Sequence, residues 1–200
     1  MPKKTFFNLD QKKQEMIVSS AIKVFSAASY DEVKIATLIR EAQIPRTSFY
    51  DYFEDKMDLY GYIMLLVSEK KKAYSSGINL QGDFFENLRA YFNAGLNFMI
   101  QEPELDALSK RLLNEPKLMM EIFGEKSMDV SNIFETMLNQ GIEDGVIREN
   151  INVSFISKTL NILSREMMLD AVKDDEHSME EIIGQISDEL ITFLQYGLKK

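Results

Sequence analysis

The chain contains no cysteine, no tryptophan and a single histidine, His177. The absence of cysteine excludes disulfides, thiol catalysis and thiolate metal sites, and it fits a reducing compartment such as the cytoplasm. Only four prolines and nine glycines occur among 200 residues, which allows long helices. The apolar run Ile63 to Val67 is far too short to span a bilayer, and the N-terminal residues have no apolar core of signal-peptide length. We therefore expect a soluble, cytoplasmic protein without a membrane partner.

Basic residues are few relative to acidic ones. The formal net charge of −9 argues against general nucleic-acid binding, because an acidic surface repels phosphate. The charge is unevenly distributed, however. Residues 1–56 carry nine Lys or Arg against eight Asp or Glu, a net charge of +1, so the remaining 144 residues carry −10. A near-neutral head on an acidic body suits a specific binder whose body stays off the DNA.

The stretch from Lys34 to Lys56 has the apolar spacing of two short helices joined by a tight turn. One buried helical stripe is formed by Ile35, Leu38, Ile39 and Ala42. Proline disfavours a helical conformation in the residue before it and suits a helix start itself, so Pro45 separates the two helices. The second helix is predicted from Arg46 to Phe53, with Phe49 and Phe53 pointing inward together.

The outward side chains of this second helix can all form hydrogen bonds. They are Arg46, Thr47, Ser48, Tyr50 and Asp51. A helix-turn-helix presents its second helix to the DNA major groove in this way, with the early residues nearest the base edges. Arg can bridge guanine O6 and N7, a hydroxyl can bond a base or a phosphate, and a carboxylate can accept from cytosine N4. A preceding helix, predicted from Asp10 to Ala28 with Asp10 as N-cap, completes a three-helix head, because such short helices need support.

Together these residues resemble the N-terminal pattern of the TetR-type transcriptional regulators. The matching positions are Ala21, Phe25, Tyr30, Ala42-Gln43-Ile44, Phe49-Tyr50-Asp51-Tyr52-Phe53 and Glu54-Asp55-Lys56. The departures are Ser29 and Gln43, where the family favours glycine, and Lys34, Pro45 and Asp51. The resemblance covers roughly the first sixty residues, and its departures affect the expected half-site sequence more than the expected fold.

The resemblance implies a role in DNA binding for individual positions. Tyr50 and Lys56 would contact phosphates, with Lys34 as a further candidate, whereas Arg46, Thr47 and Ser48 would face the bases. Asp51 and Tyr52 complete the predicted DNA-binding set. A second interpretation treats Tyr50 and Tyr52 as half-buried helix residues, and Asp51, Glu54 and Asp55 as a solvated face that caps the next helix.

The rest of the chain is also predicted to be helical. A connecting helix runs from Lys56 to about Tyr74, where Ser75-Ser76-Gly77 ends it. Further helices are predicted at Asp83 to Gln101, Pro103 to Leu113, Lys117 to Phe123, Met128 to Glu143, Val153 to Val172 and Met179 to Gly197. No stretch alternates at period two for long enough to demand a strand. We therefore expect an all-α fold, with a helix-turn-helix DNA-binding domain at residues 1–56 and a ligand-binding and dimerisation domain at residues 57–200.

The last two predicted helices carry apolar stripes that indicate a homodimer. The predicted interface residues are Ile156, Leu160, Leu163, Met167, Ile183, Ile186, Leu190 and Phe193. Both stripes are widened by Phe155, Ile162, Ile182 and Leu194. A two-helix hairpin with surplus apolar surface can bury it against a second copy as a four-helix bundle. The alternative is that the surplus packs on the protein's own body.

The region between the connecting helix and this hairpin is rich in Met and Phe. Met adapts to irregular space, so such a core can enclose an apolar ligand, and the resemblance implies a small-molecule sensor. The candidate ligand-binding residues are Phe92, Met99, Phe134, Met137, Asn161, Arg165 and Met168. Met and aromatic residues at helical spacing are also typical of plain core, and a salt bridge or a solvated face also explains Asn161 and Arg165.

Catalysis finds little support in the sequence. There is no phosphate-binding glycine loop and no Ser, His and Asp grouping, and His177 lies in an acidic inter-helix loop, so no cofactor or metal is expected. We predict a transcriptional regulator, most simply a repressor, that binds palindromic double-stranded operator DNA as a homodimer and is released by a small, largely apolar effector. The alternatives are an all-α dimeric protein-interaction module without DNA binding and, third, an all-α enzyme with an apolar pocket.

Overall fold

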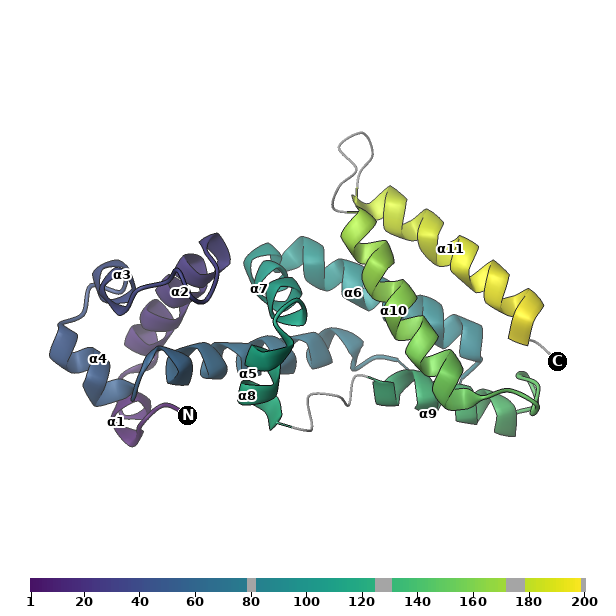
Figure 1. The fold of residues 1–200 in the computed structure, drawn as a ribbon, viewed down its shortest axis with the longest axis horizontal. Helices are drawn as coiled ribbons and strands as arrows, with labels where there is room; N and C mark the ends of the chain where they lie inside the picture. Colours follow the sequence, from purple (N-terminus) through teal and green to yellow (C-terminus); the bar gives the residue numbers. More distant parts are fainter. Residues whose placement is uncertain (79–81, 125–130, 172–178, 199–200) are drawn as a thin grey trace. The chain divides into compact units, whose positions relative to one another are not determined.

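The computed structural model describes residues 1–78, 82–124, 131–171 and 179–198. Within these residues the chain forms eleven α-helices and no strand (Figure 1), so the predicted all-α fold is confirmed. The helices are α1 (Lys4–Phe7), α2 (Gln11–Ala27), α3 (Ile35–Glu41), α4 (Arg46–Tyr52), α5 (Lys56–Ser75), α6 (Phe84–Gln101), α7 (Pro103–Leu113), α8 (Pro116–Phe123), α9 (Ser131–Glu143), α10 (Val153–Ala171) and α11 (Met179–Leu198). In the described part of the chain, none of them is long and apolar enough to cross a membrane.

The predicted helix bounds agree with the structure to within a few residues. The first part of the helix predicted from Met128 falls at residues 128–130, outside the described residues. The sequence did not predict α1, because a four-residue helix is too short to show a period. Pro45 is the N-cap of α4, with φ −61° and ψ 150°, and the first helical residue is Arg46.

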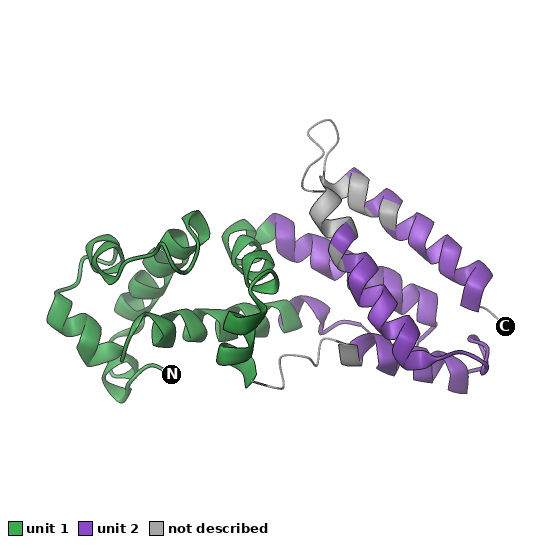
Figure 2. Ribbon diagram, viewed as in Figure 1, with its two compact units in different colours: residues 1–72, 101–124 green, residues 73–100, 125–200 purple. Residues whose placement is uncertain are grey.

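The described chain divides into two compact units (Figure 2). Unit 1 comprises residues 1–72 and 101–124, and unit 2 comprises residues 73–100 and 125–200. Unit 1 extends beyond the predicted head because α7 packs against α2. The functional boundary predicted at residue 56 is a separate matter and stays a prediction.

The core of unit 1 is built from aromatic side chains contributed by several short helices. Phe25 on α2, Phe49 on α4 and Tyr60 on α5 are all buried, as is Phe53, which directly follows α4. Phe49 and Phe53 lie with their ring centroids 5.5 Å apart, which confirms the predicted inward pair. Asp10 caps α2 as predicted, since its carboxylate accepts a hydrogen bond of 3.0 Å from the Lys13 N–H.

The turn between α3 and α4 closes with paired backbone hydrogen bonds. The Gln43 N–H donates to the Arg40 carbonyl at 3.2 Å, and the Ile44 N–H donates to the Ile39 carbonyl at 3.2 Å. This is the Schellman arrangement, in which the residue after the C-cap adopts a left-handed conformation. That residue is Gln43, with φ 51°, at a position where the TetR-type pattern favours glycine.

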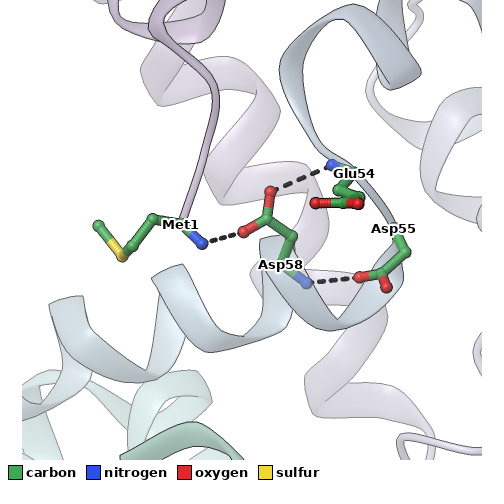
Figure 3. Close-up of polar contacts among 4 residues, drawn as sticks. All are labelled: Met1, Glu54, Asp55 and Asp58. Carbon is green, nitrogen blue, oxygen red and sulfur yellow. Dashed lines mark hydrogen bonds and ion pairs between the residues drawn. The ribbon is translucent and has the colours of Figure 1, made fainter.

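The start of α5 is fixed by two carboxylates (Figure 3). The Asp58 N–H donates to Asp55 Oδ1 at 2.9 Å, and Asp58 Oδ2 accepts from the Glu54 N–H at 3.1 Å. The Met1 amino group makes an ion pair with the other oxygen of Asp58. Acidic side chains at a helix N-terminus accept hydrogen bonds from its free N–H groups, and their negative charge interacts favourably with the partial positive charge there. The interpretation of Asp55 as a helix cap is therefore confirmed.

Unit 2 has its own core, drawn from α6, α9, α10 and α11. Its central buried residues include Phe84, Leu88, Phe134, Leu138 and Leu160. Gly141 on α9 allows a close approach there, because a Cβ added to it would lie 2.7 Å from Ile147 Cγ1 and 3.2 Å from Phe84 Cβ. The end of α11 is tied to the same core by a 3.1 Å hydrogen bond from the Arg148 N–H to the Leu198 carbonyl.

Candidate nucleic-acid interface

The second helix of the predicted motif, α4, separates its side chains into two faces. Phe49 is buried inside the head, whereas Arg46, Thr47, Tyr50 and Asp51 are exposed. Ser48 is half-buried at the edge between the two faces. The exposed face therefore carries a cation, hydroxyl groups and a carboxylate, which can donate to and accept from base edges and phosphates.

Arg46 and Tyr50 form a pair on this exposed face. The Arg46 guanidinium carbon lies 5.8 Å from the centroid of the Tyr50 ring, one helical turn away. Such a contact restricts the arginine to fewer orientations while leaving its N–H groups available to a partner. The structure thus brings together a predicted base-reading residue and a predicted phosphate contact.

Tyr52 lies on the inner side of α4. It is 9% exposed, and its ring centroid lies 6.4 Å from those of both Phe6 and Phe53. This geometry matches the interpretation of Tyr52 as a packed helix residue, so we leave it out of the proposed interface. The sequence placed it among the DNA-binding candidates because α1, which covers it, was not anticipated.

Lys56 directs its ammonium group into the head. The Nζ donates to the Tyr30 carbonyl at 2.7 Å and to the Val33 carbonyl at 2.9 Å, and it lies 4.1 Å from the centroid of the Tyr30 ring. The side chain thereby fastens the loop between α2 and α3. Its phosphate contact stays a prediction. Lys34, by contrast, is exposed at the N-cap of α3.

Arg111 on α7 holds the other end of the same loop. Its Nη1 donates to the Phe25 carbonyl at 3.0 Å and also to the Ala28 carbonyl, at the C-terminal end of α2. Cations are favourable at the partially negative end of a helix. This contact could not be predicted from local sequence patterns, because Arg111 is 83 residues from Ala28 along the chain.

Two tyrosines lie beside these cations: Tyr30 is half-buried and Tyr60 is buried. Burial, together with nearby carboxylates, first that of Asp55, raises the pKa of Tyr30 to about 12. Burial also raises the pKa of Tyr60 to about 12, helped by the Glu115 carboxylate and opposed by Arg111. Both phenols therefore remain neutral where an exposed tyrosine would ionise.

The predicted dimer residues occupy different positions in unit 2. Leu160 and Leu190 are 0% and 5% exposed and belong to its core, and Ile156 and Leu163 pack against that core. The side chains of Met167, Ile183 and Ile186 lie outside the described residues. Phe193 alone among the described members faces outward. Among the described side chains of α10 and α11, the large apolar residues that are exposed, between 62% and 90%, are Phe155, Ile162, Phe193 and Tyr196.

The predicted ligand-binding residues are mostly core residues. Phe134 and Met137 are buried at the centre of unit 2, Met99 is buried on α6, and Phe92 packs partly buried against the cluster. The Asn161 amide donates to the Ser157 carbonyl at 3.0 Å. The side chains of Arg165 and Met168 lie outside the described residues. These residues keep their assignment only as a proposal.

Comparisons with known proteins agree with this geometry. Residues 17–63 match the family model described as "Bacterial regulatory proteins, tetR family". A TetR family transcriptional regulator from Chloroflexus aurantiacus J-10-FL has a similar structure, with a TM-score of 0.77 and 24% identity over 100% of this chain and 99% of that one. No curated protein matches the chain.

Two further solved structures share the full-length fold. The transcriptional regulator FadR from Bacillus subtilis, solved in complex with stearoyl-CoA, has a TM-score of 0.72 and 17% identity, covering 88% of this chain and 97% of that one. The fatty acid degradation regulator FadR from Bacillus halodurans has a TM-score of 0.74 and 16% identity, covering 92% and 96%.

The fold and the exposed face of α4 define a helix-turn-helix DNA-binding domain in the N-terminal part of the chain. Residues 17–63 match the TetR family model, and the chain as a whole has the fold of the TetR family regulator from Chloroflexus aurantiacus.

Proposed function

We propose that this regulator acts in the cytoplasm as a repressor that binds a palindromic operator as a homodimer and leaves it when a small, largely apolar effector binds the body. The observation that carries the proposal is the exposed face of α4, with Arg46, Thr47, Tyr50 and Asp51 presented above the buried Phe49. A helix of this kind enters the major groove with its early residues at the base edges.

The test of operator binding is selection of bound DNA from a random double-stranded pool by the full chain. We expect a twofold-symmetric sequence whose half-sites lie one helical turn apart, about 34–36 Å, because two copies of α4 must reach successive major grooves. Enrichment of a single asymmetric site would refute the dimeric mode of binding. The absence of any enriched sequence would refute a specific operator.

The dimer interface in this proposal is the exposed face of α10 and α11. Phe155, Ile162, Phe193 and Tyr196 are large apolar side chains left outside the core. Scattered exposed apolar residues are normal, but four on two adjacent helices favour a partner of the same kind, as in a four-helix bundle formed across a twofold axis. The buried positions Leu160 and Leu190 instead hold the hairpin onto its own body.

The dimer is tested by Phe193→Asp, which places a charge in this face without disturbing the core. We expect a folded monomer that has lost tight operator binding, as measured by sedimentation and by DNA titration. The matched control is Gln195→Asp, which adds the same charge at another exposed position of α11. A dimeric Phe193→Asp variant with normal operator affinity would show that the interface lies elsewhere.

The effector is proposed to be a small molecule with a long apolar part. Support comes from the Met- and Phe-rich composition of the body and from the FadR structure solved with stearoyl-CoA. The probe is stearoyl-CoA, with coenzyme A alone as the control. We expect saturating stearoyl-CoA to lower operator affinity about 5- to 150-fold, and operator DNA to lower stearoyl-CoA affinity by the same factor. Unchanged operator affinity would refute an acyl-chain effector.

A further inference from the structure

The end of the reading helix α4 leaves three backbone carbonyls without a partner inside the helix. Within α4 and its C-cap, the Phe53 N–H donates to the Phe49 carbonyl at 2.8 Å. The backbone at Phe53 is then extended, with φ −129° and ψ 148°, so no further N–H turns back. The carbonyls of Tyr50, Asp51 and Tyr52 must find their donors elsewhere, as the last carbonyls of any helix must.

All three donors come from one short segment at the start of the chain. Lys3 Nζ donates to the Tyr50 carbonyl at 2.8 Å, and the Lys3 N–H donates to the Tyr52 carbonyl at 2.8 Å. The Thr5 hydroxyl donates to the Asp51 carbonyl. Residues 3–5 therefore satisfy every carbonyl that α4 leaves open at its C-terminal end.

Phe6 anchors this segment to the head. It is 0% exposed, and its ring centroid lies 5.1 Å from that of Phe53 and 5.6 Å from that of Tyr62 on α5. The Gln14 side chain on α2 also donates to the Leu9 carbonyl at 2.8 Å, which fixes the end of the segment. The segment is thus fastened to α2 and α5 while its donors hold α4.

We propose that Lys3 and Thr5 are positioning residues for sequence-specific DNA binding, which hold the C-terminal end of α4 at the orientation that base reading requires. This inference rests on the proposed use of α4 as the reading helix. A seven-residue helix has little stability of its own, so its orientation depends on such external contacts. Hydrogen bonds to base edges weaken steeply when donor and acceptor are misaligned.

The uncharged variant Thr5→Val gives the cleanest test, because it removes one donor and keeps the side-chain shape. Thr5→Ser keeps the hydroxyl and serves as its matched control. We expect Thr5→Val to lower affinity for the selected operator about two- to tenfold per half-site, with affinity for random DNA unchanged, since one hydrogen bond carries an effect of this size. Thr5→Ser should behave as the unchanged chain.

Lys3→Met tests the other donor against the possibility that Lys3 contacts phosphate. Lys4→Met removes the same charge from the neighbouring exposed residue and is its control. If Lys3 is a positioning residue, Lys3→Met should lower operator affinity more than Lys4→Met does. The salt dependence of operator binding should be the same for the two variants. A phosphate contact by Lys3 instead predicts equal losses on operator and random DNA and a salt slope smaller by about 0.9.

Hydrogen exchange without DNA separates this inference from the proposed function. Loss of the Thr5 donor should speed exchange of the Phe49 and Phe53 amides in α4, while the Leu38 amide in α3 keeps its rate. If the unchanged chain selects no DNA, the proposed function fails. If the chain selects an operator and both Thr5→Val and Lys3→Met bind it like their controls, the positioning role is overturned.

Discussion

At the scale of single residues, the turn between α3 and α4 carries a conformational cost. Gln43 has φ 51°, a left-handed conformation that L-residues other than glycine adopt at about 1–2 kcal/mol. Its side chain is exposed, so nothing in the packing requires glutamine there. Glutamine in place of glycine at this position therefore lowers the stability of the turn, but the turn keeps its left-handed geometry.

Substitutions at Gln43 should separate this backbone cost from side-chain contacts. Gln43→Gly should change the free energy of unfolding by less than about 1 kcal/mol, because relief of strain is offset by the larger entropy of the unfolded chain. Gln43→Val should lower it by about 1–2 kcal/mol, because a branched side chain clashes in this conformation. Urea unfolding of the two variants measures the difference. Equal stabilities for Gly and Val would contradict the left-handed geometry.

Lys56 is expected to contribute to stability through its two carbonyl partners. Lys56→Ala leaves the Tyr30 and Val33 carbonyls without their donor and should lower the free energy of unfolding by about 1–3 kcal/mol. Lys34→Ala, at an exposed position, should leave stability nearly unchanged. Thermal unfolding checks both. If Lys56→Ala keeps full stability but reduces the salt dependence of DNA binding, the phosphate role is the correct one.

The raised pKa values of Tyr30 and Tyr60 predict alkaline unfolding. Each phenol ionises near pH 10 in the unfolded chain and near pH 12 in the folded one, so the unfolded state loses its protons first. Stability is therefore unaffected below pH 10 and falls as the pH rises from 10 to 12. Tyr60→Phe should flatten that fall, whereas Tyr196→Phe, at a 90% exposed position, should not. Chemical unfolding at several pH values distinguishes the two.

At the scale of elements, long periodic helices were predictable and contacts between distant segments were not. The apolar spacing of Ile35 to Ala42 and the Phe49 and Phe53 pair placed α3 and α4 correctly. The α1 segment was missed because its four residues show no period, although Phe6-Phe7 beside two lysines is a signal of packing. Tyr52 packs against Phe6 of α1, a contact that the spacing within α4 alone could not indicate.

The hairpin of α10 and α11 shows what periodicity leaves open. A stripe at helical spacing indicates that a helix buries one face, but it does not say whether the neighbour belongs to the same chain. Leu160 and Leu190 are buried in the core of unit 2. Phe155 and Ile162, which the sequence places at the margin of the stripe, are exposed. The width of the stripe is the feature on which the proposed dimer interface rests.

Gly141 on α9 lies so close to the loop after the helix that one added methyl group should destabilise unit 2. Gly141→Ala should lower the stability of unit 2 by about 1–3 kcal/mol, because the added Cβ would meet Ile147 Cγ1 at 2.7 Å. Gly197→Ala is the control, since nothing lies within 4 Å of an added Cβ there. The two variants are compared by thermal unfolding. A Gly141→Ala protein as stable as the control would mean that Ile147 can move aside without cost.

At the scale of the whole molecule, the head formed by α1 to α4 is followed along the chain by the helices α5 to α11. The fold is shown by the full-length structural likeness, and the TetR family model matches residues 17–63. Sequence alone could not identify the effector or the operator, because both depend on side-chain positions that no periodicity encodes. Arg46, exposed at the start of α4 beside Tyr50, is the residue through which the reading function can be tested directly.

The most direct measurement compares the DNA sequences selected from a random pool by the unchanged chain and by Arg46→Ala. If α4 of each protomer reads the bases, Arg46→Ala should weaken operator binding by about 1–3 kcal/mol per half-site. It should also lose the preference for one base pair at equivalent positions of both half-sites, symmetrically about the centre. Identical base preferences for the two proteins would contradict the account, because α4 would then not be the element that reads the DNA.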